Sequence, residues 1–137
     1  LLRNQGCKAL VADDSLLSRS LMKQMLEKQL FDVTDAHDGQ QALEILKANP
    51  DIKLLMTDYA MPSMDGFELV KAVRNFRGRD DLAIIGLSGA GKHGLSARFI
   101  KYGANDFLTK PFSHLPFSVL LEILGTLYFI GFSVSSG

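Results

Sequence analysis

The chain has 137 residues, a length that suits one domain with a genuine hydrophobic core. Apolar residues make up 47% of it and charged residues 22%, as is ordinary for a globular protein. Fifteen basic residues balance fifteen acidic ones, which argues against a basic face for direct nucleic-acid contact. A single cysteine, Cys7, excludes an internal disulfide and favours a passive thiol in a reducing, cytoplasmic setting. Residues 1–6 lack the layout of a signal peptide, and without an initiating Met we interpret the chain as an excerpt of a longer protein.

Short apolar runs alternate with helical patterns along the chain. Strands are predicted at 8–12, 31–36, 53–57, 82–88 and 105–109, and helices at 15–30, 38–47, 66–76, 93–102 and from about Ser113 onward. The first, third and fourth runs are apolar without alternation, which is typical of a parallel sheet with helices on both faces. The charged stretch 75–81 is interpreted as a solvated loop. The pattern therefore predicts an α/β fold with a doubly wound, five-stranded parallel sheet.

Polar side chains follow the predicted strands. Asp13 and Asp14 end the first strand, Asp58 ends the third, Ser88 the fourth, and Lys110 follows the fifth. Ligands of open parallel sheets bind outside the carboxyl ends of the strands, so neighbouring first and third strands would bring the three acids together. Three carboxylates in a small volume raise one another's pKa unless a cation compensates them. Carboxylate oxygens at low ligand number suit Mg²⁺.

A plainer interpretation treats each acid as a helix N-cap or an exposed loop residue. Asp14 or Ser15 could cap the first helix, for example. The joint arrangement of acids at two strand ends, with a hydroxyl and a lysine at two more, favours a shared site instead.

Four short motifs carry a family resemblance: ADD at 12–14, TDYAMPSMDG at 57–66, LSGAG at 87–91 and LTKPF at 108–112. In this order and at these separations the sequence resembles the receiver domain of bacterial two-component response regulators, the CheY-like superfamily, over roughly residues 8–125. The resemblance implies a flavodoxin-like sheet with strand order 2-1-3-4-5. We expect a receiver domain at 1–125 and an apolar C-terminal extension or linker at 126–137.

The resemblance also implies roles for the strand-end residues. Asp58 would be the phosphoacceptor, taking a phosphoryl group from the phosphohistidine of a sensor histidine kinase or a phosphotransfer protein. Asp13 and Asp14 would hold Mg²⁺ with Asp58 and the backbone carbonyl of Ala60. Ser88 and Lys110 would contact the phosphoryl oxygens. Such a domain is not an enzyme in the usual sense, although it assists its own phosphoryl transfer and dephosphorylation.

A conformational switch is part of the same implication. Ser88 would donate a hydrogen bond once a phosphoryl oxygen is present, and Phe107 stands where relatives carry a switching aromatic ring. Phe107 lacks a hydroxyl, and packing under the last helix explains it equally well. The resemblance also implies a cis peptide between Lys110 and Pro111. Ala60 and Ala90 cannot position water through a side chain, so hydrolysis of the aspartyl phosphate is expected to be slow.

Two other functions would fit parts of the sequence. The segment 86–93, GLSGAGKH, nearly matches the phosphate-binding loop of nucleotide hydrolases, but His93 stands where the hydroxyl for Mg²⁺ is required. A non-signalling flavodoxin-like binding module would keep the sheet and lack the strand-end acids and lysine. The nucleotide-hydrolase alternative would also leave the three carboxylates without a role.

The stretch 115–134 is long and apolar enough to raise the question of a membrane span. Glu122 near its centre and the interruptions Pro116, Gly125 and Gly131 argue against membrane insertion. Its apolar surface exceeds what packing on the sheet requires, so we expect a partner. A homodimer through the face of the fourth helix, fifth strand and fifth helix is the favoured partner, with an output domain of the parent chain as the alternative.

Overall fold

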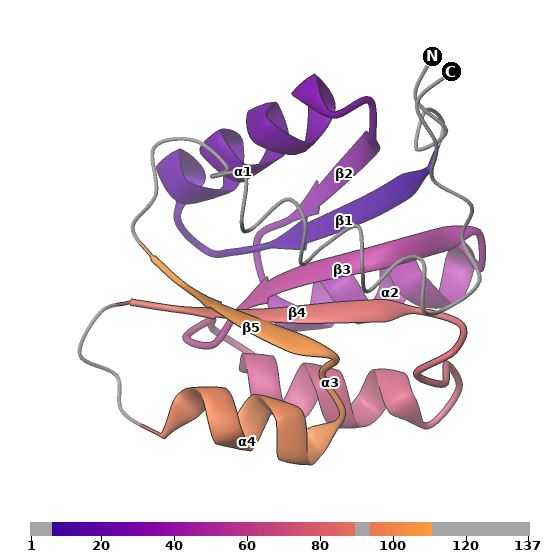
Figure 1. Cartoon of the computed structure of the whole chain (residues 1–137), viewed down its shortest axis with the longest axis vertical. Coiled ribbons are helices and arrows are strands. Elements are labelled where there is room, and N and C mark those ends of the chain that lie inside the picture. The colour runs from indigo at the N-terminus through magenta and orange to yellow at the C-terminus, as the bar shows by residue number, and fades with distance from the viewer. Residues whose placement is uncertain (1–6, 90–93, 111–137) are drawn as a thin grey trace.

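The computed structural model describes residues 7–89 and 94–110, which form a five-stranded parallel sheet and the helices that connect its strands (Figure 1). The strands are β1 (Lys8–Ala12), β2 (Asp32–Ala36), β3 (Ile52–Asp58), β4 (Ala83–Ser88) and β5 (Asp106–Thr109). The helices are α1 (Leu16–Lys28), α2 (Gly39–Ala48), α3 (Gly66–Arg74) and α4 (Leu95–Tyr102). The strand order is β2-β1-β3-β4-β5, which confirms the predicted fold class. The helix expected from Ser113 lies outside the described residues.

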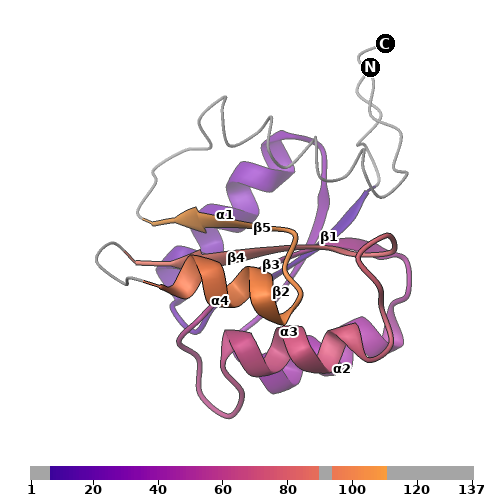
Figure 2. The ribbon, with the colours of Figure 1, turned by 60° about the horizontal axis from the view of Figure 1, so that its bottom comes forward.

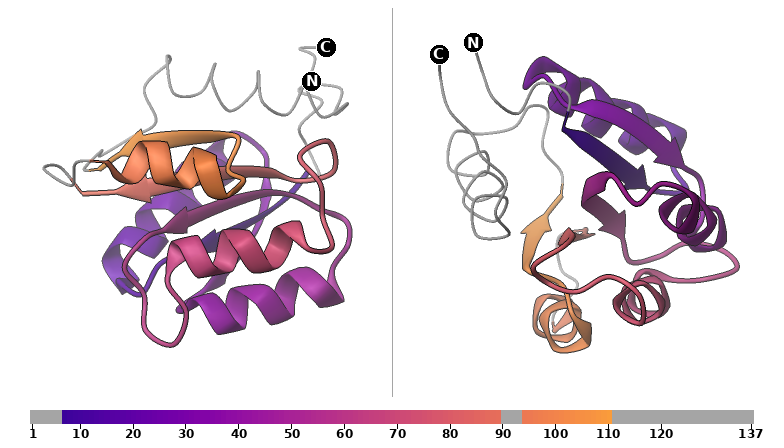
Figure 3. Two further views of the ribbon diagram at one scale, coloured as in Figure 1. Left: turned by 90° about the horizontal axis from the view of Figure 1, so that it is seen from below. Right: turned by 90° about the vertical axis from the view of Figure 1, so that its right-hand side faces the viewer.

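Helices cover both faces of the sheet (Figures 2 and 3). On one face α1 buries Met22 and Leu26 against the strands. On the other, α2, α3 and α4 lie side by side and bury Leu46, Val70 and Phe99. Full burial of each such side chain stabilises the folded state by roughly 1.5–3 kcal/mol. The two hydrophobic cores therefore fix the sheet and the positions of its strand ends.

The strand register brings successive strand ends to one edge, on the left of Figure 1. Ala12, the last residue of β1, pairs with Thr57 in β3. Ser88, the last residue of β4, pairs with Thr109 at the end of β5. The residues that follow these strands therefore emerge at the same edge of the sheet, next to one another.

Short polar side chains start the first three helices. Ser15 caps α1 by accepting a hydrogen bond from the Ser18 N–H, which leaves the Asp14 side chain outside that role. At α3 the Asp65 carboxylate accepts from the Glu68 N–H while the Glu68 carboxylate accepts from the Asp65 N–H, a reciprocal capping box. The N-cap interpretation therefore holds for Ser15 and not for Asp14.

The stretch 75–81 is not simply a solvated loop, as the sequence had suggested. Arg77 is 5% exposed, donates to the Ile52 carbonyl oxygen at 2.6 Å and is ion-paired with Asp81. Arg74 donates to the carbonyl oxygens of Gly103 and Leu82 at 2.8 Å and 2.9 Å. These guanidinium groups satisfy buried backbone acceptors at the end of the sheet opposite the strand-end acids.

Cys7 is buried, and burial raises the pKa of its thiol to about 11, as expected for a passive cysteine. Among the helices of the described ranges, none is both long and apolar enough to cross a bilayer. The apolar stretch 115–134 lies outside these ranges.

Candidate functional site

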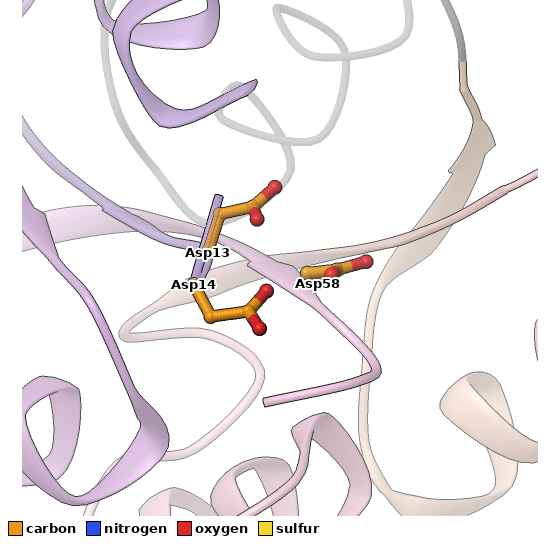
Figure 4. Close-up of side chains that lie close together, drawn as sticks. All are labelled: Asp13, Asp14 and Asp58. Atoms are coloured by element: carbon orange, nitrogen blue, oxygen red, sulfur yellow. The ribbon is translucent and has the colours of Figure 1, made fainter. Parts of the chain in front are cut away.

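Three carboxylates converge at the carboxyl edge of the sheet, as the sequence predicted. Asp13 and Asp14 follow β1 and extend toward Asp58, the last residue of the neighbouring strand β3 (Figure 4). One oxygen from each lies within 4.8 Å of the others. Asp13 is fully buried, the Asp58 side chain is 13% exposed, and Asp14 is exposed to solvent. The cluster is therefore closed on the side of Asp13 and open to solvent on the side of Asp14.

Asp13 is held from several directions. Its N–H donates to the Ala36 carbonyl oxygen at 3.1 Å, which ties the turn after β1 to β2. Its Oδ1 accepts from the Ser15 N–H at 2.9 Å. Its Oδ2 accepts from Lys110 Nζ at 2.6 Å, the short distance expected of a charge-assisted bond. Both oxygens of this buried carboxylate are thus satisfied by the protein.

Asp58 is positioned by the backbone around it. Thr57 is buried below it, and its hydroxyl donates to the Asp58 carbonyl oxygen at 2.9 Å. Gly66 packs so closely that a Cβ there would lie 2.4 Å from that same oxygen, so the start of α3 requires glycine. Lys110 Nζ lies 3.5 Å from Asp58 Oδ1, farther than from Asp13. The lysine therefore spans the two carboxylates and sits closer to Asp13.

Burial raises the pKa of the Asp58 carboxyl above its ordinary value. The ammonium of Lys110 opposes that shift, and the Asp13 carboxylate adds to it. Burial and the neighbouring carboxylate thus disfavour the ionised form of Asp58, and a bound cation would stabilise that form.

A pH-dependent stability follows from this pKa. Because the pKa is higher in the folded than in the unfolded chain, the carboxyl favours folding in acid and loses that contribution as the pH rises through its folded-state pKa. Asp58→Asn should therefore raise the free energy of unfolding at neutral pH, by a modest amount because solvent partly screens the carboxylate. The gain should vanish below the unfolded-state pKa, at about pH 3. Urea unfolding at both pH values, with Asp80→Asn at an exposed position as the control, measures it. A loss of stability at neutral pH would contradict the prediction.

Ser88 and Lys110 reach the site from β4 and β5. Ser88 is buried, and its hydroxyl makes a long contact of 3.4 Å with the Gly89 carbonyl oxygen. The Lys110 N–H donates to the Ser88 carbonyl oxygen at 2.7 Å, which joins the ends of the two strands. A hydroxyl at the end of β4 and an ammonium just after β5 thus lie on neighbouring strand ends, and the ammonium is 3.5 Å from Asp58 Oδ1.

Other predicted site residues are placed only in part. Ala60 lies in the exposed loop between β3 and α3, and the role of its carbonyl stays a prediction. Phe107 is half-buried in β5 with its ring 6.0 Å from that of Phe99, which fits packing and leaves the switching role a prediction. The Lys110–Pro111 peptide bond and Ala90 fall outside the described residues.

Sequence reasoning missed Arg19. Its Nη1 donates to the Asp13 carbonyl oxygen at 2.8 Å, and its Nε donates to Asp35 Oδ2 at 2.8 Å. Arg19 lies one turn into α1, and its backbone N–H bonds to Ser15. The acceptor is a backbone atom, which no sequence pattern marks. The only hint in the sequence was that Arg19 follows Asp13 by six residues, close enough for a long side chain on the first turn of α1 to reach back to it.

The donor set fits a small hard cation. Its side-chain ligands are carboxylate oxygens, which suit Mg²⁺, and the described residues place no thiol or imidazole among them. Three carboxylates face one ammonium group, that of Lys110, among the described residues that line the cluster, so negative charge is in excess. The cluster could therefore hold a divalent cation.

The nucleotide-hydrolase alternative does not fit the described part of 86–93. Gly86 lies inside β4, where a Cβ would stand 2.4 Å from Cγ of Phe99. This glycine accommodates an aromatic ring of α4 rather than a phosphate. The binding-module alternative expected no strand-end acids and lysine, and the structure brings them together.

Comparison with known proteins agrees with this geometry. The family model for the response regulator receiver domain matches residues 9–119. The chain is 38% identical over 121 residues to a chemotaxis protein CheY homolog of Campylobacter jejuni, covering 87% of this chain and 93% of the relative. It is equally similar to the chemotaxis protein CheY1 of Helicobacter pylori, with 38% identity over 121 residues and 98% of the relative covered.

Solved structures give the same result. A probable two-component system response regulator/GGDEF domain protein superposes with a TM-score of 0.86 at 41% identity, over 93% of this chain and 52% of that one. The chain thus spans about half the length of that protein. The CheX-CheY-BeF3-Mg+2 complex of Borrelia burgdorferi superposes with a TM-score of 0.77 at 25% identity, over 90% of both chains. With the family model, these matches show that the chain belongs to the response regulator receiver domain family of two-component systems.

Proposed function

We propose that the chain is a phosphoacceptor signalling domain in which Asp58 takes a phosphoryl group in a Mg²⁺-dependent step. The observation that carries the proposal is the convergence of Asp13, Asp14 and Asp58 within 4.8 Å, with Lys110 Nζ 3.5 Å from Asp58. The donor is a phosphohistidine on a sensor histidine kinase or a phosphotransfer protein. The domain is not an enzyme acting on a separate substrate, although it promotes its own phosphorylation and dephosphorylation.

In the transfer, an Asp58 carboxylate oxygen forms a bond to phosphorus as the P–N bond of the phosphohistidine breaks. The electron pair of the P–N bond stays on the imidazole nitrogen, so the donor histidine leaves as the free imidazole and nothing is oxidised or reduced. Lys110 is within reach to offset the negative charge of the transferring group. Mg²⁺ bound by the three acids would supply further charge stabilisation and orientation of the phosphoryl oxygens.

The buried Ser88 hydroxyl supports the proposed switch. Its present contact is long, so a phosphoryl oxygen on Asp58 would offer it a better acceptor. Movement of Ser88 would reach β5 through the Lys110 N–H bond to the Ser88 carbonyl oxygen. Phosphorylation would then favour a second conformation through a contact that exists in only one state.

In this proposal the phosphorylated domain, acting in the cytoplasm, controls the activity of a separate partner protein or of an output domain attached to it in the parent chain. The GGDEF domain protein above, of which this chain spans about half, supports an attached output domain. A homodimer through α4, β5 and the helix expected from Ser113 remains our proposal for the apolar C-terminal stretch. Ile100 on α4 is 38% exposed and is available to that surface.

The proposal is tested by incubating the protein with acetyl phosphate, with and without Mg²⁺. We expect the intact mass to rise by one phosphoryl group only when Mg²⁺ is present, and the label to be labile to base. Peptide mapping after borohydride reduction should locate the label at Asp58. A label at another residue, or one formed equally well without Mg²⁺, would refute the assignment.

A further inference from the structure

Arg19 links the turn that carries two of the acids to the neighbouring strand. Its side chain is 14% exposed and lies along α1. Nη1 donates to the backbone carbonyl oxygen of Asp13, and Nε donates to the carboxylate of Asp35 near the end of β2, each at 2.8 Å. One guanidinium group therefore joins the turn after β1 to β2.

The carbonyl that Arg19 contacts belongs to the peptide between Asp13 and Asp14. Because a peptide group is planar, fixing its oxygen fixes the direction in which the chain leaves toward Asp14. The Asp13 N–H is held by Ala36, and the Asp13 carboxylate by Ser15 and Lys110. Asp14 is exposed, and none of these bonds reaches it directly. Two contacts therefore restrain the chain on either side of Asp14: the Arg19 bond to the Asp13 carbonyl oxygen and the Ser15 N–H bond to the Asp13 carboxylate.

A cation beside a cation site is electrostatically unfavourable, so the charge of Arg19 and its orienting contacts should affect Mg²⁺ affinity in opposite directions. By Coulomb's law alone, removing its charge should tighten the binding of a divalent cation. If Arg19 instead serves to orient the acids, removing it should weaken binding. Asp35 lies against Arg19 at 2.8 Å and also 3.9 Å from Lys23, and it offsets much of the guanidinium charge.

We infer that Arg19 is a positioning residue for the cation site, acting through the peptide plane that joins Asp13 and Asp14. The inference rests on the proposed function, because it concerns the Mg²⁺ that Asp13, Asp14 and Asp58 would hold. Partners that orient metal ligands from outside the coordination shell contribute about 10- to 100-fold in metal affinity. The bidentate reach of arginine suits the role, since two acceptors on different elements must be held at once.

The test measures Mg²⁺ affinity by calorimetry for the wild type, Arg19→Gln and Lys23→Gln. Lys23 is the matched control, because it is a cation one turn further along α1 that faces the same Asp35 carboxylate and does not contact Asp13. We expect Arg19→Gln to weaken Mg²⁺ binding about tenfold, and Lys23→Gln to leave it unchanged or slightly tighter. Arg19→Lys keeps the charge, reaches one acceptor at a time, and should restore part of the affinity.

A second readout needs no metal. Amide hydrogen exchange at Asp14 and Ser15 in metal-free protein should be faster in Arg19→Gln than in the wild type or Lys23→Gln. If Arg19→Gln unfolds, Arg19→Lys and Asp35→Asn give the same comparison with a smaller change. A folded Arg19→Gln protein that binds Mg²⁺ as tightly as the wild type or more tightly would overturn the inference. If the wild type itself fails to bind Mg²⁺, the proposed function fails, and unchanged exchange at Asp14 would reject the positioning role separately.

Discussion

Replacing Asp13 and Asp14 together with asparagine is expected to remove Mg²⁺ binding while leaving the fold intact. The double variant keeps the shape of both side chains and removes two of the three carboxylates that lie within 4.8 Å of one another. The affinity for a hard dication depends on the charge of its oxygen ligands. Residues that only orient such ligands from outside the coordination shell already change metal affinity about 10- to 100-fold. Losing two direct ligands should therefore weaken binding by more than about a hundredfold. Calorimetric titration with Mg²⁺ measures the change.

The matched control is Asp32→Asn, which removes an exposed carboxylate at the start of β2, the opposite end of the sheet from the site. It should leave Mg²⁺ affinity unchanged and show that net charge alone is not responsible. The single variant Asp14→Asn should fall between the wild type and the double variant, with little change in stability because this side chain is exposed. Circular dichroism establishes that each protein is folded. Equal Mg²⁺ affinity in the wild type and the folded double variant would dismiss the site.

The fold and the convergence of the acids could be predicted because both depend on simple regularities. The three unbroken apolar runs mark strands that are covered on both faces, and parallel strands end at a common edge. Asp13, Asp58 and Lys110 were found because each directly follows or ends a strand. Their meeting needs nothing beyond the strand order, which the family resemblance supplied.

Long side chains that bond to distant backbone atoms could not be predicted in the same way. Arg19 and Arg77 look like ordinary charged residues of helices and loops. Their acceptors, the carbonyl oxygens of Asp13 and Ile52, belong to other elements and leave no trace in residue type. The role of Gly86 was hidden for a related reason, since the ring of Phe99 that covers it comes from a helix beyond the loop. Such contacts are known only once the elements are packed.

Lys110→Met is expected to change Mg²⁺ binding and phosphorylation in opposite directions. In the present geometry Lys110 Nζ lies 2.6 Å from Asp13 Oδ2, so the ammonium competes with a cation for a ligand oxygen. Its removal leaves the buried Asp13 carboxylate without that counter-charge, and Mg²⁺ should take its place with higher affinity. Because a ligand that binds only the folded state raises its stability, Mg²⁺ should raise the melting temperature of this variant more than that of the wild type.

Phosphorylation of the same variant by acetyl phosphate should slow by about a hundredfold or more, even at saturating Mg²⁺, because one preorganised charge that faces the transferring group is lost. Lys23→Met, at a half-buried position on α1, is the control and should leave the rate unchanged and the Mg²⁺ affinity unchanged or slightly higher. Lys110→Arg keeps the positive charge and changes the shape of the side chain. If the role of Lys110 is to offset the charge of the phosphoryl oxygens, this variant should restore part of the rate. The opposite signs are the decisive feature, since a variant that is merely unstable would lose Mg²⁺ affinity and rate together. Weaker Mg²⁺ binding in a folded Lys110→Met protein would show that Lys110 supports the cation site rather than competing for Asp13.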